Sequence, residues 1–338
     1  MLAVPAVGLV NSSNYCYANS VIQVLVRYIP QFAAAQLSAA IKARPAGALL
    51  LAELDAIRVT MTCLDPPKEI HSDTLERLLQ GDFGEEAQDA QEFFALCTTY
   101  LRWEMSQARE TVQCRGCGST HAKPVEERCP IQISVGPDLF AEPLPPHRSP
   151  FVESWTRAMM PTLTDLRCQD CKAEDSTVYT EMVQLAPILV FHLPEPDTGA
   201  RRDFKLPLYL EFRDRGYRLD AVILRVNYGS SSGRRARRRG GGDGELWHYI
   251  TLLYPGQSQP RPPEQPAQAR AARRARPVEA AAATAATAAT AATAAGQQVV
   301  CLDDASVTWI SLANAQERAG QSAYLVFFSL MPGAGERI

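Results

Sequence analysis

One cysteine of the chain lies where a helix is predicted to begin. Cys16 follows a polar, turn-rich run, and apolar residues with helical spacing follow it as far as Pro30. A thiol in the first turn of a helix lies near the positive end of the helix dipole, which favours the reactive thiolate form. The alternative is a small buried apolar side chain, the role of most free cysteines. Cys16 is therefore a candidate nucleophile whose partners must come from elsewhere in the chain.

A residue suited to acid–base chemistry, His248, lies in a run that alternates as a β-strand does. Residues 246–254 read Leu-Trp-His-Tyr-Ile-Thr-Leu-Leu-Tyr. Histidine is the side chain best suited to take a proton from a thiol near neutral pH. A lone histidine on such a strand more often has a structural role, so its context must decide.

Two Cys-x-x-Cys pairs, about fifty residues apart, indicate a metal site. The four cysteines are Cys114, Cys117, Cys168 and Cys171. Each pair can present two thiolates, and two pairs complete a tetrahedral structural zinc site. Gly116 and Gly118 suit the tight turn that such a pair requires. Coincidental cysteine pairs in a reduced protein and a redox pair are the alternatives, but two matched pairs favour one metal ion.

The composition indicates an ordinary globular protein. The chain has 338 residues, of which 46% are hydrophobic and 21% charged, and its net charge is −3. So small a charge predicts no general attraction to nucleic acids or membranes. Nine cysteines, an odd number in a long chain, argue against a disulfide framework and for a reducing compartment. No run approaches the roughly 18 apolar residues of a membrane-spanning helix, and no signal peptide is expected.

The elements that must position these residues change in character along the chain. Helices are predicted over 17–28, 33–42 and 46–61, at a start near 72–76, and from the acidic run 86–94 through Leu101. Strands are predicted over 131–135, 176–184, 188–193, 204–210, 217–224, 246–254 and 323–328. The first hundred residues should therefore form a helical lobe, and most of the remainder a β-rich one.

Two insertions interrupt the β-rich part. Residues 229–244 are rich in arginine and glycine, which predicts a solvated loop, with a nuclear-localisation signal as the alternative. Residues 255–298 are rich in proline, glutamine and arginine and then repeat Ala-Ala-Thr. A three-residue period forms no amphipathic helix face, so we expect a disordered insertion. Its ends can still meet, because the cost of loop closure grows only logarithmically with length.

The residues around Cys16 resemble the cysteine box of the ubiquitin-specific proteases, a papain-like family of deubiquitinases. The residues that fit this box are Gly8, Leu9, Asn11, Asn14, Cys16, Tyr17, Asn19, Ser20 and Gln23. The resemblance implies that Cys16 is the nucleophile and that Asn11 donates a hydrogen bond to the oxyanion. Ser13 stands where the family prefers glycine, and Tyr15 where it prefers threonine.

Further segments resemble other boxes of the same family in the same order. Residues 86–94 resemble the box whose aspartate, here Asp89, helps hold the tail of ubiquitin. Residues 247–254 resemble the box that supplies the general base, here His248, with Tyr249 as a substrate-binding candidate. Residues 300–308 resemble the segment whose first acidic residue, here Asp303, orients the histidine. The resemblance leaves Asp304 as a supporting group or a simple turn residue.

Some residues depart from the family pattern. Trp247 replaces the usual glycine before the histidine, and a bulky ring there could narrow the path of the tail. Arg225 stands where many relatives carry a second histidine. Residues 194–196 read Pro-Glu-Pro, where the family usually continues with Lys-Arg-Phe. His192, in the preceding strand, is expected to be structural.

The resemblance implies a single catalytic domain over residues 1–338 with an α+β papain-like fold. It should have a helical thumb lobe, a β-rich palm lobe and zinc-binding β-ribbon fingers at about 111–185. The implied activity is thiol-dependent hydrolysis of the (iso)peptide bond after the C-terminal glycine of ubiquitin. The implied partner is ubiquitin or a ubiquitinated protein, with no nucleic acid and no membrane. We expect a monomer in the cytoplasm or nucleus.

Three alternative functions remain. A catalytically impaired ubiquitin-binding protein is suggested by Trp247, Ser13 and the missing Lys-Arg-Phe. A protease for a ubiquitin-like modifier would keep the same chemistry on another substrate. A zinc-ribbon nucleic-acid binder would leave the cysteine, histidine and aspartate boxes unexplained.

Overall fold

The computed structural model describes twelve stretches of the chain. They are residues 7–11, 15–32, 45–63, 67, 69–73, 77, 89–135, 149–194, 204–212, 215–227, 247–254 and 298–331. Ser13, the predicted helix 33–42 and the arginine-rich loop 229–244 lie outside these residues, as does all but the last residue of the insertion 255–298. In the part of the chain that is described, no helix is long and apolar enough to cross a membrane.

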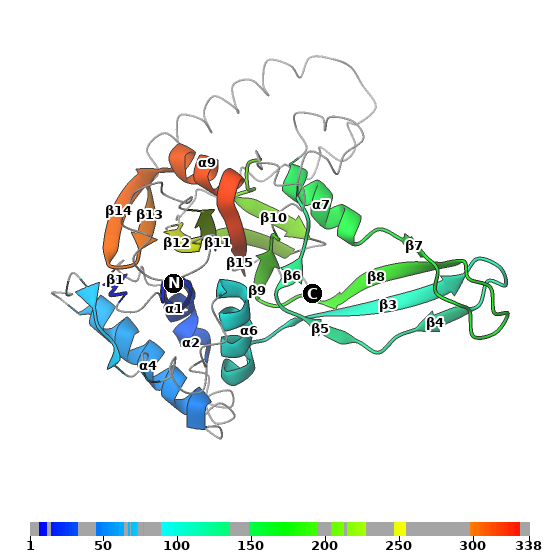
Figure 1. The fold of residues 1–338 in the computed structure, drawn as a ribbon, viewed down its shortest axis with the longest axis horizontal. Coiled ribbons are helices and arrows are strands. Elements are labelled where there is room, and N and C mark those ends of the chain that lie inside the picture. Colours follow the sequence, from blue (N-terminus) through cyan, green and yellow to red (C-terminus); the bar gives the residue numbers. More distant parts are fainter. Residues whose placement is uncertain are drawn as a thin grey trace, which may run out of the picture.

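The helices of the first hundred residues form one lobe, here called the helical lobe (Figure 1). Its elements are α1 (Cys16–Leu25), η1 (Val26–Tyr28), α2 (Ile29–Phe32), α4 (Pro45–Thr62) and α6 (Ala90–Leu101). Every residue of α1 is buried, so this helix is the centre of the lobe. The predicted end of the first helix at Pro30 is wrong. Pro30 lies in the first turn of α2, where a residue needs no free N–H.

A central sheet of eight strands carries the β-rich half of the chain. Its order is β14-β13-β12-β11-β15-β9-β6, with β10 also paired to β11. The strands are β6 (Ile131–Gln132), β9 (Ile188–His192), β10 (Tyr209–Phe212), β11 (Arg215–Asn227), β12 (Trp247–Leu253), β13 (Gln298–Asp303), β14 (Ser306–Ser311) and β15 (Ala323–Leu330). All pairs are antiparallel except β6 with β9.

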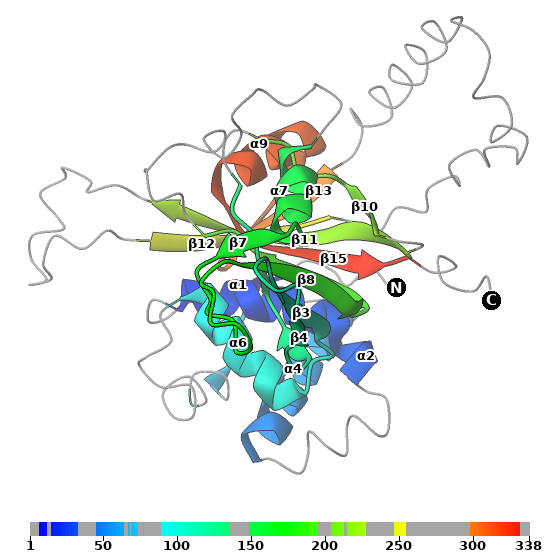
Figure 2. The same cartoon turned by 90° about the vertical axis from the view of Figure 1, so that its right-hand side faces the viewer.

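The central sheet is covered on both faces. Ile223 belongs to the core shared with the helical lobe, whereas its neighbour Val222 belongs to a second core. This alternation follows from the two-residue period of a strand. The second core lies under α7 (Pro150–Ala158) and α9 (Leu312–Ser322), which the sequence analysis does not predict. Figure 2 shows the sheet between these two helices and the helical lobe.

Several predicted strand boundaries are wrong. The strand predicted over 204–210 begins only at Tyr209, and the strand predicted over 131–135 ends at Gln132. Phe204 is buried without strand pairing, and its carbonyl oxygen would lie 2.0 Å from a Cβ placed on Gly320 of α9. The apolar pattern therefore reported burial, not strand pairing. Gln298 begins β13, so the predicted insertion ends one residue earlier than expected.

A second sheet, here called the cysteine ribbon, projects from the body of the molecule (Figure 1). It contains β3 (Ser106–Cys114), β4 (Thr120–Ala122), β5 (Glu126–Arg128), β7 (Thr162–Thr164) and β8 (Ser176–Gln184). The long pair β3 and β8 forms its axis. The helical lobe, the central sheet and the cysteine ribbon together confirm the expected α+β fold with thumb, palm and fingers.

Two short strands bring the N-terminal segment against the central sheet. β1 (Gly8–Leu9) pairs in parallel with β2 (Glu69–Ile70). The backbone N–H of Leu9 donates to the carbonyl oxygen of Asp304 at 3.1 Å, in the turn between β13 and β14. A Cβ on Gly8 would lie 2.3 Å from the carbonyl oxygen of Ala305. Only glycine therefore permits this close approach.

Candidate active site

Three residues from three separate elements form a hydrogen-bonded series. Cys16 is the first residue of α1, His248 the second of β12, and Asp303 the last of β13. His248 Nε2 lies 2.5 Å from Asp303 Oδ1, and the imidazole is also hydrogen bonded to the Cys16 sulfur. The His248 side chain is 17% exposed and that of Asp303 41% exposed, so the series opens to solvent at its carboxylate end.

The packing of α1 on the central sheet brings these residues together. The Thr251 hydroxyl of β12 donates to the carbonyl oxygen of Ser20 in α1 at 3.1 Å, and both residues are buried. In the antiparallel ladder of β12 and β13, Thr251 pairs with Leu302. The start of β12 therefore lies beside the end of β13, which places the histidine next to the aspartate.

The surroundings of His248 stabilise its protonated form. The hydrogen bond to Cys16 and then the contact with Asp303 raise the pKa of His248 from 6.5 to about 9, although burial acts in the opposite direction. An imidazole with this pKa holds a proton at neutral pH and can later release it to a leaving group. A thiol, an imidazole and a carboxylate in this order can perform nucleophilic catalysis.

Residues of the cysteine box converge on Asp304. Asn11 Nδ2 donates to Asp304 Oδ2 at 2.9 Å, and Asn19 Nδ2 donates to Asp304 Oδ1 at 2.9 Å. Gln23 Nε2 donates to the Asp304 carbonyl oxygen at 3.3 Å. Asp304 itself has a left-handed backbone, with φ 49°. Asp304 is thus a supporting group and not a simple turn residue.

Asn11 is held at both ends of its amide group. Its Oδ1 accepts a hydrogen bond from the backbone N–H of Tyr15 at 2.8 Å, while its Nδ2 donates to Asp304. An amide nitrogen carries two hydrogens, so one N–H of Asn11 remains for a further acceptor. The structure therefore fixes the orientation of the residue that the sequence singles out as an oxyanion donor.

Asp89 joins the helical lobe to the central sheet. As the residue before α6 it caps the helix, since Oδ1 accepts from the backbone N–H of Gln91 at 2.7 Å. Its Oδ2 accepts from the Tyr249 hydroxyl at 2.8 Å, and the Tyr324 hydroxyl donates to Oδ1 at 2.9 Å and to Oδ2 at 2.8 Å. Burial and the nearby Asp89 charge raise the pKa of both tyrosines, so they remain donors.

Sequence reasoning missed Tyr324 as a partner of Asp89. It identifies the strand 323–328 as a closing strand but gives no role to its tyrosine hydroxyl. The available signal is a tyrosine in an otherwise apolar strand, because a buried hydroxyl needs a hydrogen-bond partner.

Trp247, next to the histidine, packs against an arginine. The guanidinium carbon of Arg225 lies 4.1 Å from the centroid of the Trp247 ring and 5.3 Å from that of the Tyr324 ring. Arg225 and Trp247 are both half-buried. The two departures from the family pattern are therefore in contact with each other.

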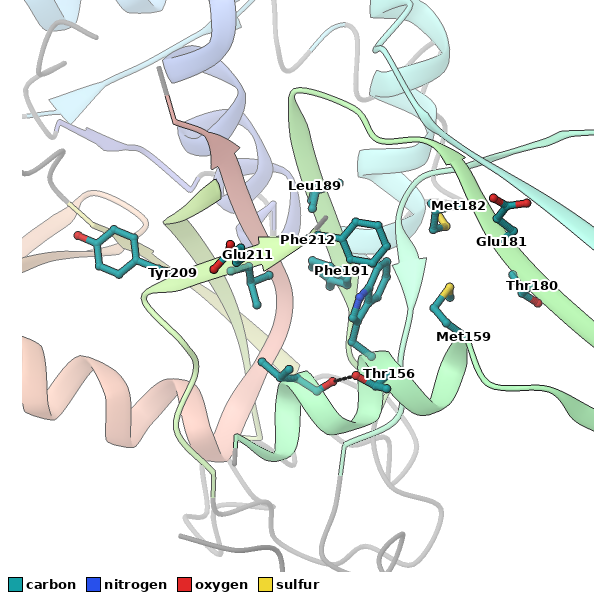
Figure 3. A pocket seen from close by; sticks show the side chains of 13 residues that line it. Thr156, Met159, Thr180, Glu181, Met182, Leu189, Phe191, Tyr209, Glu211 and Phe212 are labelled. Carbon is teal, nitrogen blue, oxygen red and sulfur yellow. Dashed lines mark hydrogen bonds between the residues drawn. The ribbon is translucent and has the colours of Figure 1, made fainter. Parts of the chain in front are cut away.

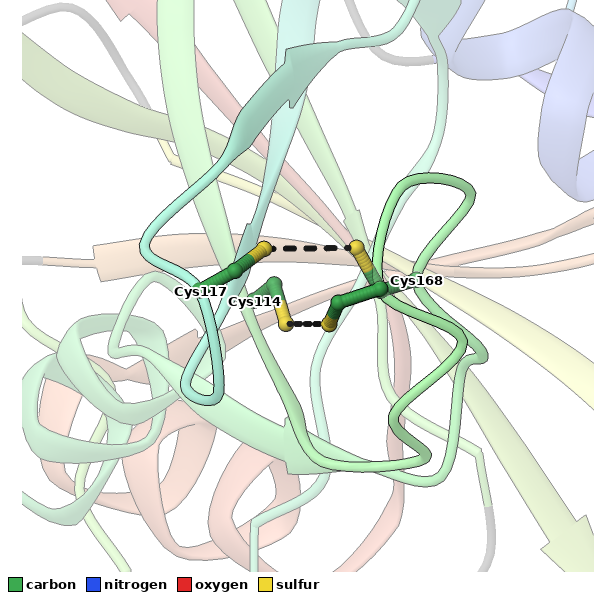
Figure 4. Close-up of side chains that lie close together, drawn as sticks. Cys114, Cys117 and Cys168 are labelled. Carbon is green, nitrogen blue, oxygen red and sulfur yellow. Dashed lines mark hydrogen bonds between the residues drawn. The ribbon is translucent and has the colours of Figure 1, made fainter.

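The four cysteines of the two pairs come together at the ribbon (Figure 4). Cys114 Sγ lies 3.5 Å from Cys171 Sγ, and Cys117 Sγ lies 3.7 Å from Cys168 Sγ. All four sulfurs lie within 4.8 Å of one another. A tetrahedral zinc ion with bonds of about 2.3 Å requires sulfur atoms about 3.8 Å apart, so the arrangement could bind zinc.

The glycines of the first pair fit this arrangement. Gly118 has φ +74°, a conformation that L side chains rarely adopt. A Cβ on Gly116 would lie 3.6 Å from the sulfurs of both Cys114 and Cys171. The turn therefore leaves the sulfurs close together without a side chain between them.

A cavity of about 540 Å³ lies away from these residues (Figure 3). It opens between α7, β8, β9 and β10, and its walls include Trp155, Phe191 and Met182. Glu181 and Glu211 lie among its few charged side chains. No residue of the Cys16–His248–Asp303 series lines it, so the cavity is not the reaction site.

Comparisons with known proteins place the fold. The family model described as ubiquitin carboxyl-terminal hydrolase matches residues 7–233, more than half of the chain. A search of curated proteins found no match. The structure of a yeast SAGA DUBm carrying an Sgf73 mutant matches with a TM-score of 0.61 and 14% identity, covering 96% of this chain and 68% of that chain.

Two further solved structures are similar. The SAGA Ubp8/Sgf11/Sus1/Sgf73 DUB module bound to ubiquitin aldehyde has a TM-score of 0.58 and 14% identity, with 96% of this chain and 70% of that chain covered. The same module bound to monoubiquitin has a TM-score of 0.56 and 13% identity, covering 96% and 69%. At these identities the structures show a shared fold, and the family match shows kinship. The chain belongs to the ubiquitin carboxyl-terminal hydrolase family, whose members are thiol-dependent ubiquitin hydrolases.

Proposed function

We propose that the protein hydrolyses the bond after the C-terminal glycine of ubiquitin, with Cys16 as nucleophile. His248 is the general base and acid, and Asp303 orients its imidazole. The observation that carries this proposal is the hydrogen-bonded series from the Cys16 sulfur through His248 to Asp303. Its members come from distant positions, and their order matches that of a papain-like triad.

The chemistry follows from this arrangement. The Cys16 sulfur attacks the carbonyl carbon of the terminal glycine, and His248 holds the thiol proton. The free N–H of Asn11 stabilises the oxyanion, an effect worth about 3 kcal/mol for one such donor. His248 then protonates the leaving amine, and a water molecule releases ubiquitin from the thioester.

Asp89 and Tyr249 are the proposed contacts of the substrate tail. A carboxylate has about four acceptor sites, and three donors already hold Asp89 in place. The remaining site can accept a backbone N–H of an extended tail without loss of this arrangement. Tyr249 acts mainly by holding Asp89, since its hydroxyl donates to it.

The four cysteines are the proposed ligands of one structural zinc ion. The metal would tie the turn after β3 to the Cys168–Cys171 loop before β8 and so stiffen the cysteine ribbon, the proposed grip on the body of ubiquitin. We propose one catalytic domain over residues 1–338, with fingers at about 111–185, acting as a monomer. Its reduced cysteines are suited to the cytoplasm or nucleus.

A ubiquitin probe with a thiol-reactive group at its C-terminus tests the proposed function. The wild-type protein should form a covalent adduct, and mass spectrometry of the digested adduct should locate it at Cys16. Cys16→Ser should abolish the adduct, whereas Cys63→Ser, which changes an exposed cysteine, should not. Binding without an adduct would instead support the catalytically impaired binding protein.

A second candidate function is hydrolysis of a ubiquitin-like modifier. The contact between Trp247 and Arg225 favours it, because both residues depart from the family pattern next to the proposed base. The same reactive group on a panel of modifiers separates the two candidates. The modifier that reacts fastest with Cys16 identifies the substrate.

A further inference from the structure

Arg225 lies on the side of the central sheet that faces the helical lobe. It pairs with Tyr249 in the ladder of β11 and β12, and residues opposite each other in such a ladder point to the same face. Tyr249 reaches Asp89 of the helical lobe from this face. Arg225 also lies over the ring of Tyr324, the other tyrosine that donates to Asp89.

The guanidinium group is held in place but not neutralised. Two aromatic rings fix its position, with centroids 4.1 and 5.3 Å away. Its Nε is buried and has no hydrogen-bond partner among the residues that the structure describes. A buried donor without an acceptor is costly, so such a group is suited to an acceptor that arrives with a ligand.

The expected ligand can supply such an acceptor. An extended chain presents N–H groups and carbonyl oxygens alternately on opposite sides. A tail lying between the helical lobe and the central sheet would give an N–H to Asp89 on one side and a carbonyl oxygen to Arg225 on the other. Trp247 precedes His248 in β12, so this contact would fall close to the bond that is cleaved.

We propose that Arg225, held against Trp247, binds the substrate tail by donating hydrogen bonds to its main-chain carbonyl oxygens opposite Asp89. The inference rests on the proposed function and adds a specificity residue to it. Trp247 is then the support that positions the guanidinium, and not only a bulky replacement for glycine. Recognition of main-chain oxygens also makes the contact compatible with ubiquitin's basic tail.

Steady-state hydrolysis of a fluorogenic ubiquitin C-terminal substrate tests the role of Arg225. Arg225→Gln should raise KM about tenfold or more and change kcat less than about threefold, because the contact serves binding. Arg225→Lys should be intermediate, since it keeps the charge but loses the planar fork. Arg58→Gln is the matched control, because Arg58 pairs only with Asp55 in α4. An unchanged KM in Arg225→Gln would overturn the proposal.

Trp247→Gly separates support from obstruction. If Trp247 positions Arg225, Trp247→Gly should raise KM, and the double variant with Arg225→Gln should be no worse than the poorer single variant. A lower KM in Trp247→Gly would show that the ring only obstructs the tail and would overturn its supporting role.

A binding measurement distinguishes the tail contact from a loss of structure. In a Cys16→Ala background, Arg225→Gln should weaken binding of full-length ubiquitin by the same factor as KM. It should leave binding of ubiquitin that lacks its C-terminal tail unchanged. Equal weakening of both ligands would overturn the proposal. Failure of the wild-type protein to hydrolyse the substrate would instead contradict the proposed function, so the two failures remain distinct.

Discussion

Asn11 and Asp304 are 293 positions apart in the chain, yet Asn11 Nδ2 donates to Asp304 Oδ2 at 2.9 Å. The same carboxylate accepts from Asn19, and the Asp304 carbonyl oxygen accepts from Gln23. Two regions that the sequence identifies separately, the cysteine box and the acidic segment near the C-terminus, are thus halves of one hydrogen-bonded unit. The unit holds the proposed oxyanion donor beside the start of α1.

Removal of the Asp304 carboxylate should impair the chemical step. In Asp304→Ala, Asn11 loses its acceptor and can turn away from the oxyanion, so kcat should fall about 10- to 100-fold. KM should change less, because Asp304 touches no proposed binding residue. Steady-state kinetics on a fluorogenic ubiquitin substrate measure both constants. Asp55→Ala is a control on the surface of α4, and a kcat equal to wild type in Asp304→Ala would contradict this role.

The pH profile of activity should have its alkaline limit near the pKa of His248. That pKa is raised from 6.5 to about 9, so the imidazolium persists through neutral pH and is lost as the pH rises through 9. Accordingly kcat/KM should fall above about pH 9. Asp303→Asn removes one of the causes of the raised pKa and should move this limit to lower pH. A limit that stays in place in Asp303→Asn would show that the carboxylate does not act on His248.

Loss of the proposed zinc ion should weaken recognition of ubiquitin more than the chemistry itself. The cysteine ribbon carries the four sulfurs, whereas Cys16 and His248 lie on α1 and the central sheet. Metal analysis of purified protein should therefore find about one zinc per chain, and Cys117→Ser should lose it. Hydrolysis of a ubiquitin substrate should then fall in kcat/KM at least about tenfold.

A short peptide with the same C-terminal residues provides the control for the zinc prediction. Its slow cleavage should change little in Cys117→Ser, because the peptide does not reach the ribbon. Cys63→Ser should retain the metal and full activity. Full zinc content in Cys117→Ser would exclude the proposed ligand set.

Gly8→Ala should damage the site from a position that takes no part in the chemistry. A Cβ there would lie 2.3 Å from the carbonyl oxygen of Ala305, so the β13–β14 turn must move. The free energy of unfolding should fall by about 1–3 kcal/mol, and kcat should fall with the displacement of Asp304. Chemical denaturation and kinetics on the same variant check both expectations. Wild-type values of both would show that the segment adapts without cost.

The sequence by itself determined the family and much of the local structure. Helix α4 and strand β8 were predicted almost to the residue, because a long periodic run between turn residues leaves little choice of conformation. The cysteine pairs declared a metal site by spacing, and the family boxes named Cys16, His248 and Asp303. Each of these signals is contained in a short stretch of chain.

Only the tertiary structure decided how distant residues share their hydrogen bonds. The bond from Tyr324 to Asp89, the stacking of Arg225 on Trp247 and the anchoring of Asn11 by Asp304 leave no mark on local periodicity. Burial of Phe204 without strand pairing has the same origin, since an apolar pattern reports burial but not the partner. Packing joins side chains far apart in sequence, and their geometry exists only once the chain has folded.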